Sequence, residues 1–269
     1  MAGMQEARAV ALYLLVEVLT YAKLLFLLLC QWLQGGGVSL PKDRQARRLV
    51  HAVAALGDDH LLGMGDYTTL MGPCGCLGRL QRGLEQEGTV RQRWTVVNLA
   101  KFGSTSEKWR PPPRGRKDSS SLFYRAFAKG TDLRKCCRFV VLCIGSNDPN
   151  SGIAPEQSME NIERTCEDLL ALGFTVLLCT LPLFGILPEA RRHAEDLNRR
   201  IRAYCSSRRH VKLELGLELD KQYFANAGCK GFRGKYFSSR GHQRIADALL
   251  ERLLNPIRAV EYDVWKELL

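Results

Sequence analysis

The sequence predicts an α/β fold of three layers, α/β/α, in which helices cover both faces of a five-stranded parallel sheet. Two observations lead to this prediction. Short, strongly apolar runs alternate with segments of helical periodicity, and motifs rich in Gly, Asp and Asn directly follow the apolar runs. The five candidate strands are residues 49–56, 94–99, 139–144, 174–180 and 211–215.

The candidate helices lie between or after these strands, at residues 155–172, 188–205 and 240–254, where apolar side chains recur every three or four positions. Pro155 and Pro188 stand in the first turn of their helices, where a missing amide hydrogen is tolerated. Parallel sheets of this kind bind ligands at the carboxyl ends of their strands, so we expect the functional residues in the motifs found there.

A chain of 269 residues, with 46% hydrophobic and 25% charged residues, suits one globular domain with an appendage. We expect this domain at residues 38–254, an N-terminal unit at 1–37, and a C-terminal tail at 255–269 that binds a partner. The net charge of +11 indicates an anionic partner (an acidic phospholipid surface, an acidic protein or nucleic acid) or a solvated basic surface. No RNA-binding signature accompanies the charge, so nucleic acid is disfavoured.

Much of the excess positive charge is local. Residues 107–138 hold ten Lys or Arg against three Asp or Glu, a net charge of +7. This region includes a basic insertion at residues 108–135, whose Pro- and Ser-rich start is typical of an exposed loop. The candidate contacts for an anionic partner are Lys42, Arg44, Arg47, Arg48, Arg114, Arg116 and Lys117.

The ten cysteines do not follow the spacing of a secreted disulfide framework, and several lie inside apolar runs, as Cys143 and Cys179 do. We expect buried free thiols in a reducing compartment. Zinc binding by the cysteines at 74, 76, 136 and 137 is disfavoured, because neither pair has the two-residue gap of zinc knuckles. We therefore predict no metal and no cofactor.

Residues 9–33 form a long apolar segment, which predicts a single N-terminal membrane helix followed by a flexible glycine linker. Glu17 and Lys23 interrupt the segment, so a helix that packs against other protein, or a buried core helix, is the alternative. Basic residues follow the segment, and basic flanks stay on the cytosolic or mitochondrial-matrix side. We expect the main domain on that side.

Each of the first four candidate strands ends in a distinct motif, and a further polar block lies near the end of the domain. In chain order these motifs are Gly57-Asp58-Asp59, Gly103, Gly145-Ser146-Asn147-Asp148, Leu181-Pro182 and the block at residues 236–246. Their order and spacing resemble the SGNH hydrolases, also called GDSL-type esterases and lipases. The resemblance spans roughly residues 52–254 and implies a flavodoxin-like α/β/α fold.

The family's reaction needs a serine nucleophile after the Gly-Asp pair, a glycine N–H and an asparagine side chain for the oxyanion, and a histidine base. An aspartate three residues before the histidine orients it. By this resemblance Asp59 stands at the nucleophile position, while Gly103 and Asn147 match the oxyanion donors.

The final block can be placed in two registers. Anchoring on Ser238 and Gly241 puts Tyr236 at the position of the base and Arg233 at the position of the orienting acid. The other register takes His242 as the base, with a serine in place of the orienting aspartate. Either register lacks the aspartate.

These substitutions predict that the chain is not an enzyme, because a carboxylate at Asp59 would repel an oxyanion and a tyrosine with a reference pKa of about 10 is a poor base. Asp59 has two other interpretations: a helix N-cap, or a carboxylate nucleophile served by His60 or His242. No catalytic residue is expected, and the vestigial catalytic pocket comprises Asp58, Asp59, Gly103, Asn147, Arg233 and Tyr236.

We therefore expect a structural or accessory subunit of a membrane protein complex, for which a mitochondrial membrane is one candidate location. One alternative is a module that binds anionic lipid or RNA through the basic insertion. Another is an active esterase or lipase on acyl substrates. Packing roles are expected for His51, Trp94 and Trp109, and solvent-facing positions for His193 and His210.

Overall fold

The computed structural model describes residues 2–33, 38, 40–66, 75–113, 118–184, 187–207, 216–217, 219–224 and 236–269. Within these residues a parallel sheet of four strands has the order β2-β1-β3-β4. The strands are β1 (Val50–Gly57), β2 (Arg93–Asn98), β3 (Cys137–Cys143) and β4 (Thr175–Leu178). They match the first four predicted strands to within a few residues, whereas the fifth prediction, residues 211–215, lies outside the described residues.

The centre of the sheet forms the core. Every residue of β1 is buried, and so is all of β3 except Arg138, because strands covered on both faces exclude water from both sets of side chains. Cys143 and Cys179 are buried free thiols, as predicted. Trp94 and His51 stack at a ring-centroid distance of 4.7 Å and are also buried, so their predicted packing roles are confirmed.

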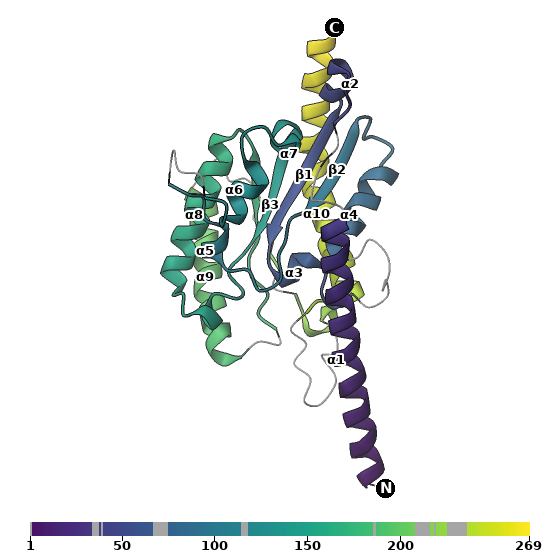
Figure 1. Cartoon of the computed structure of the whole chain (residues 1–269), viewed down its shortest axis with the longest axis vertical. Coiled ribbons are helices and arrows are strands. Elements are labelled where there is room, and N and C mark those ends of the chain that lie inside the picture. Colours follow the sequence, from purple (N-terminus) through teal and green to yellow (C-terminus); the bar gives the residue numbers. More distant parts are fainter. Residues whose placement is uncertain are drawn as a thin grey trace.

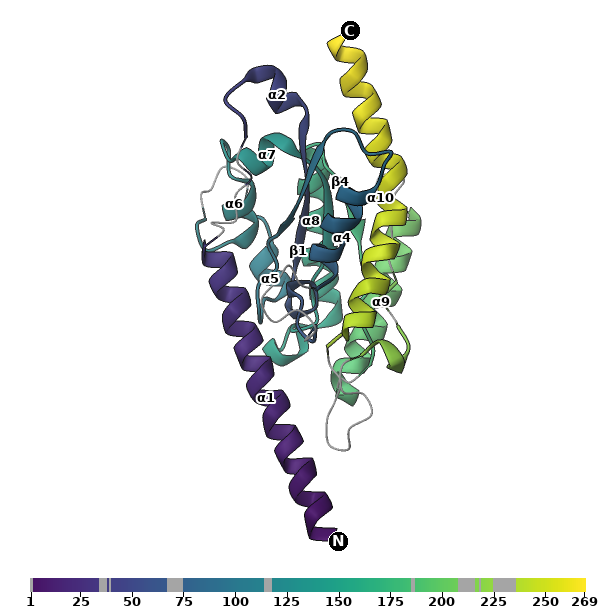
Figure 2. The ribbon, with the colours of Figure 1, turned by 90° about the vertical axis from the view of Figure 1, so that its right-hand side faces the viewer.

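Helices lie on both sides of the sheet. The helices α4 (Gly75–Gln86) and α10 (Ser239–Leu268) lie on one side of β1, and α5 (Ser106–Trp109), α6 (Leu122–Phe127) and α7 (Asp132–Cys136) lie on the other (Figure 2). The long helices α8 (Pro155–Ala171) and α9 (Pro188–Ser207) pack on each other toward β4 (Figure 1). This arrangement is the predicted three-layer fold.

The helix predicted at residues 240–254 continues to Leu268, although Pro256 lies inside it. Tertiary contacts explain why the helix does not stop. The buried carboxylate of Glu261 accepts hydrogen bonds from the backbone N–H of Arg91 and Gln92 and, at 2.9 Å, from the indole of Trp94. Part of the predicted tail is thus attached to the start of β2.

The basic insertion was expected to begin with an exposed loop, and residues 114–117 within it lie outside the described residues. Its second half forms α6 and α7, whose Phe127 and Leu133 are buried in the core. Apolar side chains at helical spacing therefore outweigh the high charge of this region.

Helix α1 (Ala2–Leu33) extends from the body of the domain toward one end of the molecule, opposite the end of α10 (Figure 1). Along the described parts of the chain, no helix is long and apolar enough to cross a membrane, which corrects the predicted membrane helix at residues 9–33. Lys23 on this helix is fully buried. At this position the helix therefore packs against its own chain, whereas the alternative of packing against other protein stays a prediction.

Candidate functional site at the carboxyl ends of the strands

Asp58 begins the site, directly after β1. Its carboxylate caps the short helix α3 (Asp59–Leu62) by accepting the His60 N–H, and it also accepts the Ser146 hydroxyl at 2.7 Å and the Ser146 N–H at 3.1 Å. Complete burial, followed by the charge of the neighbouring Asp59, raises the pKa of Asp58 to about 7. The hydrogen bonds from Ser146 and His60 oppose this rise.

Asp59 is the first residue of α3, and its side chain points to the neighbouring loops. Its Oδ1 accepts the backbone N–H of Gly103 at 2.7 Å and the Asn147 amide Nδ2 at 3.4 Å. The prediction that Asp59 is the N-cap was wrong, because Asp58 takes that role. Asp59 is buried and instead connects the segments that follow β1, β2 and β3.

The two donors to Asp59 are held by the loops that follow β2 and β3. Gly103 has a φ of 65°, a left-handed conformation that favours glycine, although a side chain there would meet no atom within 4 Å. The Asn147 amide also donates to the Ser104 carbonyl at 3.2 Å, which fixes its orientation. The sequence motifs thus correctly predicted that these residues meet Asp59 at one edge of the sheet.

Tyr236 approaches Asp59 from the segment before α10. Its hydroxyl donates to Asp59 Oδ2 at 3.5 Å, the long limit of a hydrogen bond. Its ring lies 6.0 Å from that of His60, and Phe237 packs on His60 at 5.4 Å. His60 is therefore buried beside aromatic rings rather than exposed in an open cleft.

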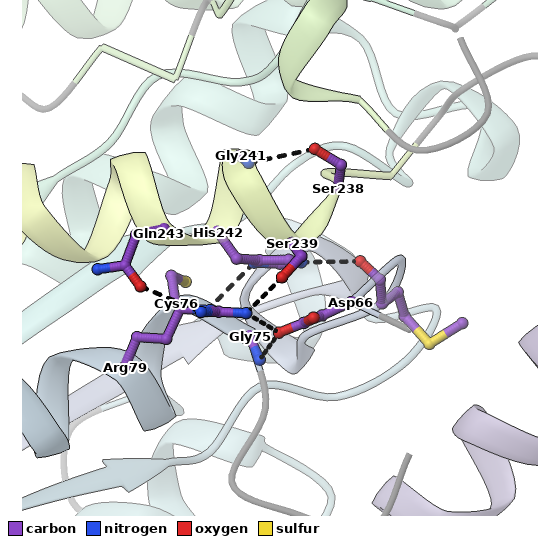
Figure 3. Close-up of polar contacts among 10 residues, drawn as sticks. Asp66, Gly75, Cys76, Arg79, Ser238, Ser239, Gly241, His242 and Gln243 are labelled. Atoms are coloured by element: carbon purple, nitrogen blue, oxygen red, sulfur yellow. Dashed lines mark hydrogen bonds and ion pairs between the residues drawn. The ribbon is translucent and has the colours of Figure 1, made fainter. Parts of the chain in front are cut away.

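His242 lies elsewhere, in a cluster of contacts that we call the α4–α10 clamp: Asp66, Cys76, Arg79, Ser239 and His242 (Figure 3). Its Nδ1 accepts the Cys76 N–H at 3.2 Å, so the proton is on Nε2, which donates to the Met64 carbonyl at 2.9 Å. Burial lowers the pKa of His242 to about 4. Nδ1 therefore holds α10 to α4, and Nε2 holds it to the segment between α3 and α4.

The clamp also contains a buried ion pair. Arg79 donates to Asp66 at 3.0 Å and to the Ser239 hydroxyl at 2.6 Å, and Asp66 additionally accepts the Gly75 N–H at 3.1 Å (Figure 3). The Asp66 side chain is fully buried, whereas that of Arg79 is 14% exposed. These bonds join the start of α10 to the segment between α3 and α4.

Asp148 does not bond to Asp59 in the contacts described here but connects α5 and α8 beside the site, a role that the motif alone did not indicate. It accepts the Ser106 N–H at 2.8 Å and the Ser158 hydroxyl at 2.5 Å.

His193 lies 3.4 Å from the Ser158 hydroxyl and is buried, so the prediction that it faces solvent was wrong. Its position in a polar stretch gave no sign of this, because helix α9 turns that residue inward. The other histidine expected to face solvent, His210, lies outside the described residues.

Trp109 is a packing residue, as predicted, with one polar function. Its buried indole donates to the Gly57 carbonyl and the Ser104 hydroxyl, both at 3.2 Å. It therefore ties α5 to the end of β1, next to the aspartates.

The remaining predicted residues are not part of this site. Arg233, Arg114, Arg116 and Lys117 lie outside the described residues. The basic residues Lys42, Arg44, Arg47 and Arg48 are exposed in or beside α2 (Arg44–Arg48), which precedes β1 and so lies at the opposite edge of the sheet (Figure 1). Two of the four already have partners within the chain: Arg47 donates to the carbonyl oxygens of residues 41 and 42, and Arg48 pairs with Glu267.

The described residues contain no group of three or more His, Cys, Asp or Glu side chains that could hold a metal ion. Of the cysteines considered for zinc, Cys76, Cys136 and Cys137 are buried free thiols, and Cys74 lies outside the described residues. The carboxylates of Asp58 and Asp59 are engaged by hydrogen-bond donors of the protein itself. The site therefore consists of acids and neutral donors.

Comparison with known proteins agrees with this architecture. The model of the GDSL-like lipase/acylhydrolase family matches residues 34–244, and the chain therefore belongs to that family. A comparison with curated protein sequences found no match.

Solved structures with the same fold include a lipase/acylhydrolase from Enterococcus faecalis, with 17% identity, a TM-score of 0.55 and coverage of 77% of this chain and 96% of that one. The structure of TesA has 21% identity and a TM-score of 0.55, covering 77% of this chain and 99% of that one. An aryl esterase from M. smegmatis has 14% identity and a TM-score of 0.55, covering 76% and 99%. At these identities the likeness concerns the fold alone.

Proposed function

We propose that this chain is a non-hydrolytic member of the family that serves as a structural or accessory subunit of a larger protein complex. The position of the Asp59 carboxylate carries the proposal. In the family's reaction, a glycine N–H and an asparagine amide hold the negatively charged oxygen of the transition state. Here the corresponding donors, Gly103 and Asn147, donate to Asp59.

An ester bound at this site would have to compete with a carboxylate that is part of the chain. Negative charge that develops on its carbonyl oxygen would also lie beside Asp59. Two like charges 4 Å apart repel by about 4 kcal/mol at the effective dielectric constant of a partly buried site. Loss of a single oxyanion donor already slows such reactions by about 10² to 10³-fold. These effects together disfavour hydrolysis.

The base is also unsuitable. Tyr236 is the described residue of the final block whose side chain reaches Asp59, which favours the register that puts it at the base position. The Nδ1 lone pair of His242 accepts a backbone N–H in the α4–α10 clamp and is not available for a proton from a nucleophile. The same geometry disfavours His242 as a base for Asp59 acting as a carboxylate nucleophile.

Exposed apolar side chains support the role of a subunit. Six large side chains on α1 are between 54% and 67% exposed: Val10, Leu14, Leu15, Val18, Tyr21 and Leu25. Tyr262 and Trp265 are more than half exposed near the end of α10. A group of large exposed apolar side chains is typical of protein interaction sites. A location in the cytosol or the mitochondrial matrix stays a prediction.

The competing function is that of an active esterase or lipase, which the family and the named structural neighbours favour. Hydrolysis of a short-chain p-nitrophenyl ester separates the two. We expect no turnover by the wild-type protein above the uncatalysed rate. Turnover that disappears in an Asp59→Ala variant would overturn the proposal.

A reconstituted variant makes the test sharper. We expect the triple variant Asp59→Ser, Arg233→Asp and Tyr236→His to hydrolyse the ester, because Asp59→Ser frees both oxyanion donors and the other two changes supply a base with its orienting acid. The matched control adds Asn147→Ala to the triple variant, which should remove most of the gain. Equal rates in the triple variant and its control would show that these residues do not form an oxyanion site.

The accessory role needs a separate measurement. Purification of the tagged full chain from its native source should yield stably associated proteins that co-migrate in native electrophoresis. Charged substitutions at Leu14 and Val18 should release them, because both side chains are more than half exposed on α1. Recovery of a free monomer would contradict the proposal.

A further inference from the structure

Helix α1 exposes a regular row of apolar side chains. They are separated alternately by four and three residues, and the row consists of Leu14, Val18, Tyr21, Leu25 and Leu28. Each of these residues is between 41% and 67% exposed. Steps of four and three average to a period of about 3.5 residues, which is the spacing of the seam along which two helices supercoil. The row therefore has the spacing of a helix–helix interface.

The row faces away from the body of the domain. On another side of α1, Lys23 is fully buried, and Leu19 and Phe26 are half-buried. These three positions are also separated by four and three residues, so they mark the side of the helix that contacts the chain's own body. The N-terminal part of α1 projects beyond the body (Figure 1, Figure 2). A second molecule can therefore reach the row.

The exposed side of α1 favours a protein partner over a lipid surface. Between residues 10 and 29, every exposed side chain that the structure describes is apolar except for the hydroxyl of Tyr21. Two copies of this surface would not repel each other. Helices that lie on a lipid surface carry many Lys and Arg on their polar side. In α1 the basic residues are Arg8 and Lys23, and Lys23 is buried, so a helix of another molecule fits better.

The row is complementary to itself when two copies of α1 run antiparallel. In the register that places Val18 opposite Tyr21 of a second copy, the outward steps of four and then three residues coincide on the two helices. The pairs that this register adds are Leu14 with Leu25 and Ala11 with Leu28. Twofold symmetry makes each pair occur twice. Such a contact closes on itself and gives a dimer, the commonest oligomer of soluble proteins.

The exposed area of α1 is large enough for a stable pair. Eight large apolar residues of the helix are at least 41% exposed, namely the five of the row together with Val10, Leu15 and Leu29. They offer on the order of 800 Å², which is what each partner of a standard-sized complex buries. Self-pairing of α1 would therefore bury an interface of ordinary size.

We infer that this chain forms an antiparallel dimer through α1, in which the row of one copy packs against the same row of a second copy. The inference rests on the proposed function in taking the exposed side of α1 as an interface, and it names a second copy as the first partner there. It does not depend on the loss of hydrolysis. Other members of the complex would then bind the paired helices rather than a single α1.

Sedimentation equilibrium of the purified full chain tests the dimer. We expect the wild type to have twice the mass of one chain. Leu14→Glu should raise the dissociation constant of the dimer by at least about 10-fold, because it buries a charge opposite Leu25 twice in each dimer. The matched control is Leu187→Glu, the same substitution at a leucine outside α1 that is 51% exposed. Thermal melting verifies that each variant is folded.

A mixing experiment tests the antiparallel register. Leu25→Lys should weaken the dimer in the same way as Leu14→Glu. A mixture of the two variants should form a mixed dimer, because the substituted positions face each other and carry opposite charges. In a parallel pair each position would instead lie beside its own counterpart, and mixing would bring no gain.

Four results would overturn the inference: a monomeric wild type, equal dissociation constants for Leu14→Glu and Leu187→Glu, absence of a mixed dimer, or a monomer that co-sediments with phospholipid vesicles. A monomeric wild type that still co-purifies with other proteins would leave the proposed function standing. A dimer that co-purifies with no other protein would support the inference and contradict the proposed accessory role.

Discussion

The Asp59 centre, formed by Asp58, Asp59, Gly103, Asn147 and Tyr236, and the α4–α10 clamp contain the same kinds of side chain that a hydrolase uses. The two groups use these side chains in opposite ways. In the centre, Asp58 and Asp59 are adjacent buried carboxylates, and burial together with the charge of Asp59 raises the pKa of Asp58. In the clamp, a buried carboxylate is paired with Arg79, and a buried histidine has a lowered pKa. The ring nitrogens of His242 bond to Cys76 and Met64 and do not serve Asp59, which teaches that residue content alone does not make a catalytic site.

The largest expected effect breaks the clamp. Arg79→Ala should lower the free energy of unfolding by about 3 to 5 kcal/mol, because it removes an ion-pair partner of the fully buried Asp66 carboxylate. Urea denaturation measures the change. The matched control is Arg48→Ala, whose ion pair with Glu267 has side chains 47% and 64% exposed and should contribute at most about 1 kcal/mol. Equal losses in the two variants would show that the clamp does not stabilise the fold.

The second prediction concerns Asp58. The folded state binds a proton at Asp58 more tightly than the unfolded state, since the pKa rises from 3.8 to about 7. This contribution to stability is therefore complete below about pH 4 and is lost as the pH rises to about 7, a loss on the order of 4 kcal/mol. Asp58→Asn should remove this loss. Urea denaturation at pH 4, 5.5 and 7 compares the slopes, and identical slopes would contradict the raised pKa.

The clamp should show the opposite pH dependence. The pKa of His242 falls from 6.5 to about 4 on folding, so its contribution to stability is complete above pH 6.5 and is lost as the pH falls toward 4. The loss is on the order of 3 kcal/mol. In His242→Gln, acidification over this interval should cost less stability than in the wild type. A variant that is as sensitive to acid as the wild type would mean that His242 is not buried as a neutral ring.

The smallest effect tests the backbone of the centre. Gly103→Ala should cost about 1 to 2 kcal/mol, because alanine is strained at a φ of 65°. Gly88→Ala is the matched control: neither glycine has an atom within 4 Å of an added Cβ, and Gly88 lacks the positive φ. Thermal denaturation of both variants separates backbone strain from crowding. A Gly88→Ala variant that is destabilised as much as Gly103→Ala would remove the argument from φ.

Several features followed from the sequence because they depend on local pattern. Apolar runs predicted four strands, and helical spacing predicted α8 and α9 to within two residues at their ends. The motifs predicted that Asp59, Gly103 and Asn147 meet, because the carboxyl ends of parallel strands share one edge of the sheet. Family membership, too, was visible in these motifs.

Other features depended on contacts between residues far apart in the chain, so only the tertiary structure decided them. It placed Asp59 Oδ1 on the Gly103 N–H, brought Tyr236 to the same carboxylate and engaged His242 in the clamp, although the sequence left two registers open. It also turned His193 inward and extended α10 past Pro256, where Glu261 binds the start of β2. The physical reason is the same in each case: a polar group withdrawn from water must find a hydrogen-bond partner, and the fold determines which one is within reach.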